Sequence, residues 1–272
     1  MLMLDYQPNT MFVIVGIALI IAIIVDLIIY SKNKYTKNNL EKLCLKLKNF
    51  LENQKVCDSH GLRHMIRVMI LCKFACEADL NLNERQKHLI CCAGLLHDVD
   101  DKKLFPDSIN YANLRRLMKS YPKKDVDLVV EMVSYVSSSE NGDTIPKNAI
   151  ENPWLLYPRH ADRIEAIGKV GMIRCYQYNN KPGYKLFTAE TKRALNKDDL
   201  WNNIATVERY NSYKGNSASM IDHFYDKMLR AGMFQTENTF LDDKRKDKLE
   251  PMVEFILKFG TTGKIDLDML ND

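Results

Sequence analysis

Residues 93–103, AGLLHDVDDKK, decide the fold class. The stretch begins with apolar and small residues that complete a helical pattern, and it continues with His97, Asp98, Asp100 and Asp101. Acidic side chains at a helix C-terminus oppose the helix dipole, at a cost of roughly a few tenths of a kcal/mol each. A bound cation would offset that cost. The stretch therefore predicts a metal site where an apolar helix ends.

Upstream, residues 60–68 read HGLRHMIRV and place His60 and His64 four residues apart. Side chains at this spacing lie on one face of a helix, one turn from each other. A zinc metalloprotease motif would need glutamate directly after the first histidine, but that position is Gly61. The pair therefore indicates a metal or substrate site of another kind.

Downstream, residues 152–174 read NPWLLYPRHADRIEAIGKVGMIR. They place Asp162 and Glu165 three apart in an amphipathic helical pattern. Each of these acids, taken alone, is more often an ordinary solvated or buried residue than a ligand. The prediction of a site depends on their combination with the two histidine segments.

The rest of the chain has apolar residues at spacings of three and four, and alternating strand patterns are nearly absent. Turn residues separate the helical patterns, and no internal repeat or flexible linker divides them. The sequence predicts an all-α fold, a helical bundle preceded by one transmembrane helix, with helices at about 39–54, 60–79, 83–99, 108–120, 124–138, 153–178, 200–212, 216–231 and 243–259.

Composition narrows the class of protein. The 272 residues are 46% hydrophobic, enough to bury a core, which excludes a disordered or fibrous chain. A net charge of +4 suits small anionic substrates and falls short of a specific nucleic-acid binder. Seven cysteines fit a reducing compartment better than a disulfide framework. Cys72, Cys76, Cys91 and Cys92 could form a soft-metal cluster, but their apolar surroundings favour packing as small hydrophobes.

The N-terminus contains the apolar run 11–30, which has the length of a transmembrane helix and one charge, Asp26. The alternatives are a cleaved signal peptide and a buried core helix, but no basic region precedes the run and no cleavage site follows it. Lysines after the run place the remainder in the cytosol. We expect a membrane anchor over 1–35 and a catalytic domain over 36–272, localised as a single-pass membrane protein with the catalytic domain on the cytosolic side.

The segments H-x-x-R-V, HD and ADR resemble the HD superfamily of metal-dependent phosphohydrolases. The similarity is closest to the bacterial HD-domain nucleotide pyrophosphohydrolases, because HFYDKML at 223–229 and TENTFLDDKRKD at 236–247 also match; it covers roughly 58–260. This chain departs from that group at His160, Glu165 and Asp100. The resemblance implies four metal ligands: His64, His97, Asp98 and Asp162.

The resemblance also implies that the ion activates water, which attacks the α-phosphorus of a nucleoside triphosphate and releases pyrophosphate. Two imidazoles and two carboxylates suit Mn²⁺ first, and also Mg²⁺, Co²⁺ or Fe²⁺. We expect Asp101 and Glu165 to orient water or move protons. The expected substrate contacts are His60, Arg67, Lys103, Arg174, His223 and Lys227. His88 is expected at the surface.

Two other functions stay open at this stage. One is another phosphoesterase of the superfamily, such as a 5′-nucleotidase or a cyclic-nucleotide or alarmone hydrolase. The other is a catalytically silent, membrane-tethered nucleotide-binding protein. The expected partners are a nucleotide and, through 11–30, a membrane; a homo-oligomer is left open.

Overall fold

A computed structural model describes residues 35, 37–52, 54, 56, 61–137 and 141–270. Helices and turns account for their regular structure, and no strand occurs in these ranges, which confirms the all-α prediction. The helices are α2 (Lys37–Glu52), α3 (Leu62–Ala78), α4 (Glu84–Leu96), α5 (Ala112–Leu117), α6 (Lys123–Ser134), α8 (Lys147–Glu151), α9 (Tyr157–Ala166), α10 (Gly168–Asn179), α11 (Lys197–Asp199), α12 (Val207–Ser212), α13 (Met220–His223), α14 (Leu229–Ala231) and α15 (Thr239–Thr262). Short 3-10 or π turns are η2 (Pro153–Leu156), η3 (Leu200–Ile204), η4 (Phe224–Met228) and η5 (Asp268–Leu270).

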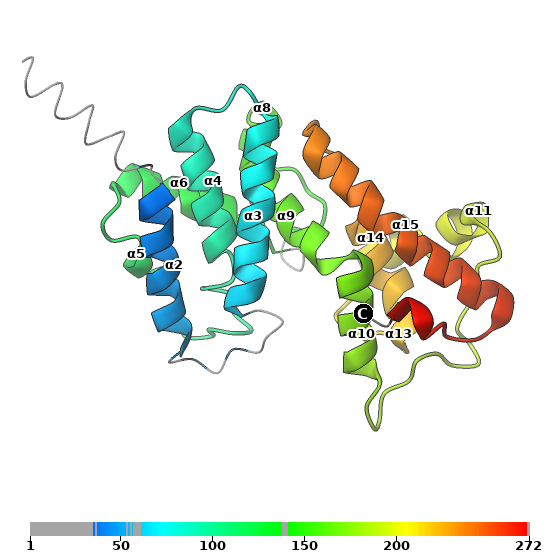
Figure 1. The fold of residues 1–272 in the computed structure, drawn as a ribbon. Helices are drawn as coiled ribbons and strands as arrows, with labels where there is room; N and C mark the ends of the chain where they lie inside the picture. The colour runs from blue at the N-terminus through cyan, green and yellow to red at the C-terminus, as the bar shows by residue number, and fades with distance from the viewer. Residues whose placement is uncertain are drawn as a thin grey trace, which may run out of the picture.

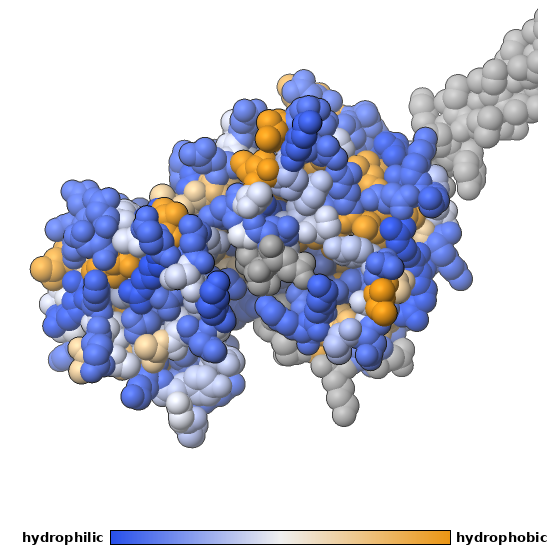
Figure 2. All heavy atoms as spheres, turned by 180° about the vertical axis from the view of Figure 1, so that it is seen from behind, coloured by the Kyte–Doolittle hydropathy of each residue, from blue (hydrophilic) through white to orange (hydrophobic). Residues whose placement is uncertain are grey.

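The helices form two lobes, each with its own hydrophobic core. Helices α2 to α9 build the first lobe, and α10 to α14 lie in the second, as Figure 1 shows. Helix α15 serves both cores, because Leu241 is buried in the first and Phe255 in the second. Seen from behind, the surface is notched between the lobes and is mostly hydrophilic (Figure 2).

Helix α4 is the centre of the first lobe and packs against α2, α3, α6 and α9. It begins at a capping box, in which Asn83 accepts from the backbone N–H of Gln86 and the Gln86 side chain accepts from that of Asn83. The polar Asn83 therefore sets its start as expected. Its last nine residues are all buried, so its C-terminal end carries His97 into the interior.

The helix expected over 153–178 is broken in two. Gly168 has a φ of +74°, a conformation that favours glycine, and its backbone N–H lies 3.0 Å from Met252 Sδ. A Cβ at this position would also meet the side chain of Lys248 at 3.0 Å. The chain therefore ends α9 in the first lobe and begins α10 in the second.

Two further expected helices are interrupted. The stretch 200–212 contains the π turn η3 followed by α12, and 216–231 contains α13, the π turn η4 and α14. Helix α8 was not expected, and α15 is longer than the predicted 243–259. Periodicity alone does not separate a π turn from an α-helix, because both bury residues at nearly the same spacing.

The structure contradicts the predicted localisation. In the ranges that it describes, no helix combines the length and the apolar character needed to cross a bilayer. The segment 11–30, on which the anchor prediction depended, lies outside those ranges. We therefore withdraw the assignment of the chain as a single-pass membrane protein.

The described cysteines are free thiols, and all but Cys44 are buried. Cys72, for example, packs so closely on Gly94 that a Cβ there would lie 2.6 Å from its sulfur. Among the described residues, the side chains grouped closely enough to hold a metal ion are His64, His97 and Asp98, and none is a cysteine. The thiols therefore serve as small core residues.

His88, expected at the surface, is buried, because nearly every face of α4 is covered by other helices. Its Nε2 lies 2.9 Å from Tyr121 Oη, and its ring stacks on that of Tyr121. Burial lowers the pKa of His88 from its ordinary 6.5 to about 4, although Asp125 counteracts this. The imidazole is therefore neutral in the folded protein near pH 5, whereas it is charged in the unfolded chain.

This difference predicts acid sensitivity. Below pH 6.5 the unfolded chain binds a proton that the folded chain does not, so the free energy of unfolding should fall by roughly 2 kcal/mol between pH 7.5 and 5 through this group. Urea unfolding of the parent and His88→Gln at both pH values measures it. The variant should lose about that much of the pH dependence; an identical dependence in both proteins would contradict the assignment.

Candidate metal centre and adjoining groove

Four predicted ligands meet at one place although they come from three separate segments. His64 lies on α3, His97 and Asp98 follow the end of α4, and Asp162 lies on α9. The Nε2 atoms of the two histidines are 3.1 Å apart. Asp98 Oδ2 lies 3.6 and 3.4 Å from these nitrogens, and Asp162 Oδ1 lies 3.3 and 3.5 Å from them.

The spacings among His64, His97 and Asp98 fit a shared divalent ion, and Asp162 lies at similar distances from both histidines. Ligand-to-ion distances of about 2.1 Å imply ligand-to-ligand edges of about 3.0 Å in octahedral and about 3.4 Å in tetrahedral coordination. Asp98 Oδ2 is buried and has no hydrogen-bond donor among the residues that the structure describes. A buried carboxylate oxygen without a donor is costly, and a cation satisfies it. The donor set therefore suits a metal of the Mn²⁺ or Mg²⁺ type.

The backbone fixes the orientation of His97. Its Nδ1 lies 2.9 Å from the carbonyl oxygen of Gly94, which can only accept, so Nδ1 carries the hydrogen. The neutral ring then presents the lone pair of Nε2 to His64, Asp98 and Asp162. A hydrogen bond of this kind, made by the nitrogen that faces away from the metal, sets the tautomer that a ligand histidine needs.

The four groups perturb one another strongly. Burial opposes a charge on His97, but the carboxylates of Asp98 and Asp162 outweigh it and hold the pKa of His97 well above its usual range. The pKa of His64 is raised by Asp162 and Glu165 against the effect of burial. The imidazoles lower the pKa values of both aspartates, again against burial. The centre is thus a negative pocket that favours a cation, with which protons would compete.

Glu165 lies behind His64 instead of among the four donors. Its Oε1 is 3.9 Å from His64 Nδ1 and 2.9 Å from Arg67 Nε, and its Oε2 is 3.8 Å from Lys248 Nζ. Its side chain is 4% exposed. The carboxylate thus touches the side of the imidazole that faces away from the donor cluster, where it can orient the ring.

The other acids of the 93–103 stretch have separate partners. Asp100 accepts from the backbone N–H groups of Asn113 and Leu114, at 3.0 and 2.9 Å, and so caps the start of α5. Asp101 accepts from the backbone N–H of Lys103 at 2.7 Å. Three aspartates of this stretch suggested a metal site, and among them only Asp98 lies in the donor cluster. Asp100 instead binds the first backbone N–H groups of α5.

A groove of about 1060 Å³ runs between the start of α3, the face of α10 and the η4 turn. The described residues that line it include no aspartate or glutamate, and five of them are basic: Arg63, Arg67, Arg174, Lys181 and Lys227. His223 also lines it. Converging cations without carboxylates attract an anion.

The groove gathers four of the six expected substrate contacts: Arg67, Arg174, His223 and Lys227. Burial lowers the pKa of Lys227, the charge of Lys103 lowers it further, and that of Asp162 counteracts this. Lys227, a groove residue, therefore lies close enough to Asp162 of the donor cluster and to Lys103 for their charges to act on it. His60 lies outside the described residues.

Sequence reasoning did not single out Arg63 and Lys181. Their only signal is position: Arg63 is in the matched 60–68 segment, and Lys181 follows the helix that carries Arg174. His160, which departs from the family pattern, is buried and stacks on Phe234 with the ring centroids 4.3 Å apart. Burial and two neighbouring arginines lower the pKa of His160 to about 3, so it is a neutral packing residue.

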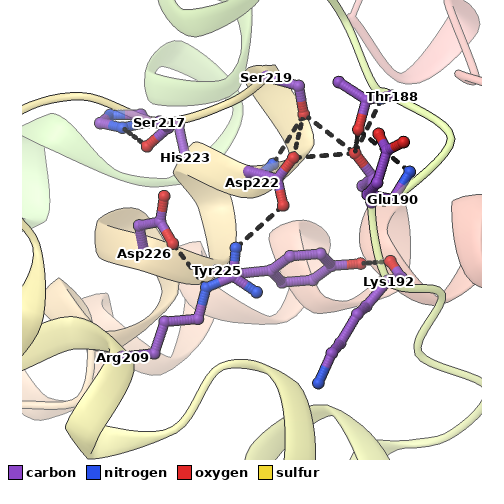
Figure 3. Close-up of polar contacts among 11 residues, drawn as sticks. Thr188, Glu190, Lys192, Arg209, Ser217, Ser219, Asp222, His223, Tyr225 and Asp226 are labelled. Atoms are coloured by element: carbon purple, nitrogen blue, oxygen red, sulfur yellow. Dashed lines mark hydrogen bonds and ion pairs between the residues drawn. The ribbon is translucent and has the colours of Figure 1, made fainter.

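A polar network holds the η4 turn in place (Figure 3). Arg209 donates to Asp222 Oδ1 at 2.9 Å and to Asp226 Oδ1 at 2.5 Å, while Asp222 Oδ2 accepts from Ser219 and Thr191 at 2.6 and 2.8 Å. Asp222 and Asp226 lie one turn apart, so Arg209 ties two successive turns together. The groove residues His223 and Lys227 are the next residues along the chain and are positioned by this network.

No protein-family model matches the chain. The uncharacterized protein L803 of Acanthamoeba polyphaga mimivirus is 32% identical over 234 residues, which cover 79% of this chain and 93% of that protein.

Solved structures share the fold. An HD-superfamily hydrolase of Bacillus thuringiensis superposes with a TM-score of 0.55 at 16% identity, over 83% of this chain and 98% of that one. Bacillus subtilis YpgQ superposes with a TM-score of 0.54 at 20% identity, over 84% and 99%. YpgQ in complex with ADP gives 0.52 at 21% identity, over 82% and 95%. The chain has an HD-like fold and belongs to the same family as the mimivirus protein L803.

Proposed function

We propose that this protein is a metal-dependent phosphohydrolase acting on nucleotides. The observation that carries the proposal is the meeting of four metal-type donors, with 3.1 to 3.6 Å between a histidine nitrogen and each other donor, beside a groove with five basic residues and no acid among the described residues of its lining. The fold shared with an HD-superfamily hydrolase supports it.

His64, His97, Asp98 and Asp162 would hold the ion. When bound, a divalent cation supplies Lewis-acid polarisation of a phosphoryl oxygen and lowers the pKa of a water ligand. The Gly94 carbonyl keeps the Nε2 lone pair of His97 directed at the centre. Glu165, fixed by Arg67 and Lys248, orients His64 instead of handling the proton of the attacking water.

The groove cations would bind and neutralise the phosphate chain. Lys227, which senses the charge of Asp162, would contact the phosphate nearest the metal, and Arg174 would contact the next one. Asp101, three residues after Asp98, remains our candidate for orienting the water.

The finer proposal is cleavage of a nucleoside triphosphate into monophosphate and pyrophosphate, with Mn²⁺ as the metal. Arg67 pairs with Glu165, and the other four groove cations match the charge of a triphosphate better than that of a monophosphate. The structure of YpgQ in complex with ADP supports a nucleotide ligand.

Product analysis tests the proposal. The purified protein with Mn²⁺, Mg²⁺ or Co²⁺ is incubated with ATP, GTP, a nucleoside monophosphate, a cyclic nucleotide and a guanosine tetraphosphate alarmone. Pyrophosphate with an equal amount of monophosphate is expected. Orthophosphate alone, or cleavage of a cyclic nucleotide or alarmone in preference to triphosphates, would replace the finer proposal with another phosphoesterase of the same centre. No turnover of any substrate by metal-loaded protein would overturn the enzymatic proposal altogether.

A further inference from the structure

Two tyrosines with open ring faces lie at the outer end of the groove. Tyr178 near the end of α10 and Tyr184 in the following turn are 58% and 50% exposed. Their ring centroids are 5.0 Å apart at an interplanar angle of 67°, and their hydroxyl oxygens are 3.2 Å apart. Lys181 Nζ lies 5.7 Å from the Tyr178 ring centroid. Each tyrosine therefore braces the other, while much of both rings stays accessible.

The tyrosine pair is continuous with the phosphate-binding face of α10. Gly171, Arg174 and Tyr178 recur at spacings of three and four residues and all line the groove, so they share one side of the helix. From Ile167, beside the metal-centre lobe, to Tyr178 the helix rises about 16 Å. Arg174 lies between these two residues on the groove side of α10, and the tyrosine rings lie at the far end.

The third groove tyrosine differs from this pair. Tyr213 Oη lies 3.3 Å from His223 Nδ1, and its ring centroid lies 5.6 Å from that of His223, so the two residues support each other inside the groove. The Tyr178 and Tyr184 rings instead offer flat apolar surface next to cations, in a groove whose described lining contains no acid. Their natural ligand is a flat aromatic group attached to negative charge, which is the chemistry that nucleotide-binding surfaces recognise by stacking.

We infer that Tyr178 and Tyr184 form a stacking site for the base of the nucleotide, while Lys181 and Arg174 bind phosphates between the base and the metal centre. This inference rests on the proposed function, because it places the base of that substrate. A stacking site of this kind tolerates different bases, since every base has a π face. It therefore predicts broad base specificity.

Titration calorimetry with two ligands tests the inference apart from catalysis. ATP carries a base and inorganic tripolyphosphate does not. Both are titrated into the His97→Ala protein, which should not turn them over, and into the same protein with Tyr178→Ala, Tyr178→Phe or Phe74→Ala added. Phe74 is a 45% exposed aromatic residue of α3 outside the groove lining, so it is a matched control.

Tyr178→Ala should weaken ATP binding by about 5- to 150-fold, which corresponds to the loss of one stacking interaction, and should leave tripolyphosphate binding unchanged. Tyr178→Phe, which keeps the ring, and Phe74→Ala should bind both ligands like the parent. Equal affinities of the alanine variant and the parent for ATP, or equal losses for both ligands, would overturn the stacking site. Failure of the parent to bind ATP more tightly than tripolyphosphate would also overturn it. Hydrolysis by the wild-type protein is measured separately, so a failure of the proposed reaction stays distinguishable.

Discussion

The His97→Ala variant should lose its bound divalent ion, and with it the proposed hydrolysis, by roughly 10²- to 10³-fold or more in kcat/KM. His97 is a firmly fixed member of the proposed ligand set: it is buried, its Nδ1 is held by Gly94, and its Nε2 faces all three other donors. Removing the imidazole takes away one of the two histidine nitrogens that face the buried Asp98 Oδ2. Metal content by elemental analysis after dialysis, together with single-substrate kinetics, measures the effect.

His88→Gln is the matched control, because it changes another buried histidine of the same helical segment that does not contact the donor cluster. Near pH 7.5, where His88 is neutral in the folded and unfolded chain, this variant should keep its metal and its activity. A His97→Ala protein that retains a full equivalent of metal would show that the ion, if bound, lies elsewhere.

Gly260→Ala should destabilise the folded protein by roughly 3 kcal/mol. The segment before α11 crosses α15 so closely that a Cβ on Gly260 would lie 1.8 Å from the Ala194 carbonyl oxygen and 2.7 Å from its carbonyl carbon. These are backbone atoms, and Arg193 Nε anchors the segment by donating to the Gly260 oxygen at 2.8 Å. The backbone must move, and overpacking of this kind typically costs about 1 to 3 kcal/mol, occasionally more.

The better helix propensity of alanine, worth up to about 1 kcal/mol, offsets only part of that cost. For a chain of this size, the loss should lower Tm by roughly 6 to 12 °C in a thermal melt. Glu254→Ala, at an exposed position of the same helix, should change Tm by no more than about 2 °C. A Gly260→Ala protein that melts with the parent would mean that the two segments are not in contact.

Local signals in the sequence were enough to predict the helical fold and the four candidate ligands. Asn83 predicts the start of α4, and the apolar run after it must be buried. His97 and Asp98 are therefore expected at the buried end of this helix. The family pattern supplied the pairing with His64 and Asp162, and the structure brings the four together.

Long-range contacts were the part that local patterns could not reveal. The break at Gly168 depends on Met252 and Lys248, which are about eighty residues away in the chain. The position of Glu165 behind His64 depends on Arg67 and Lys248 in the same way. The capping role of Asp100 could not be predicted, because nothing near it in sequence shows that α5 needs a cap.

The contacts of α15 with the joint between α9 and α10 have a consequence for biosynthesis. Met252 Sδ accepts a hydrogen bond from the Gly168 N–H. Lys248 Nζ donates to the Ile164 carbonyl oxygen at 2.9 Å and lies 3.8 Å from Glu165 Oε2. The ribosome makes these residues after those of the first lobe, because synthesis runs from the N-terminus to the C-terminus and folding follows it. A nascent chain can bury its first core and gather His64 with His97, but the angle that joins this half to the cationic groove is fixed only when α15 has emerged.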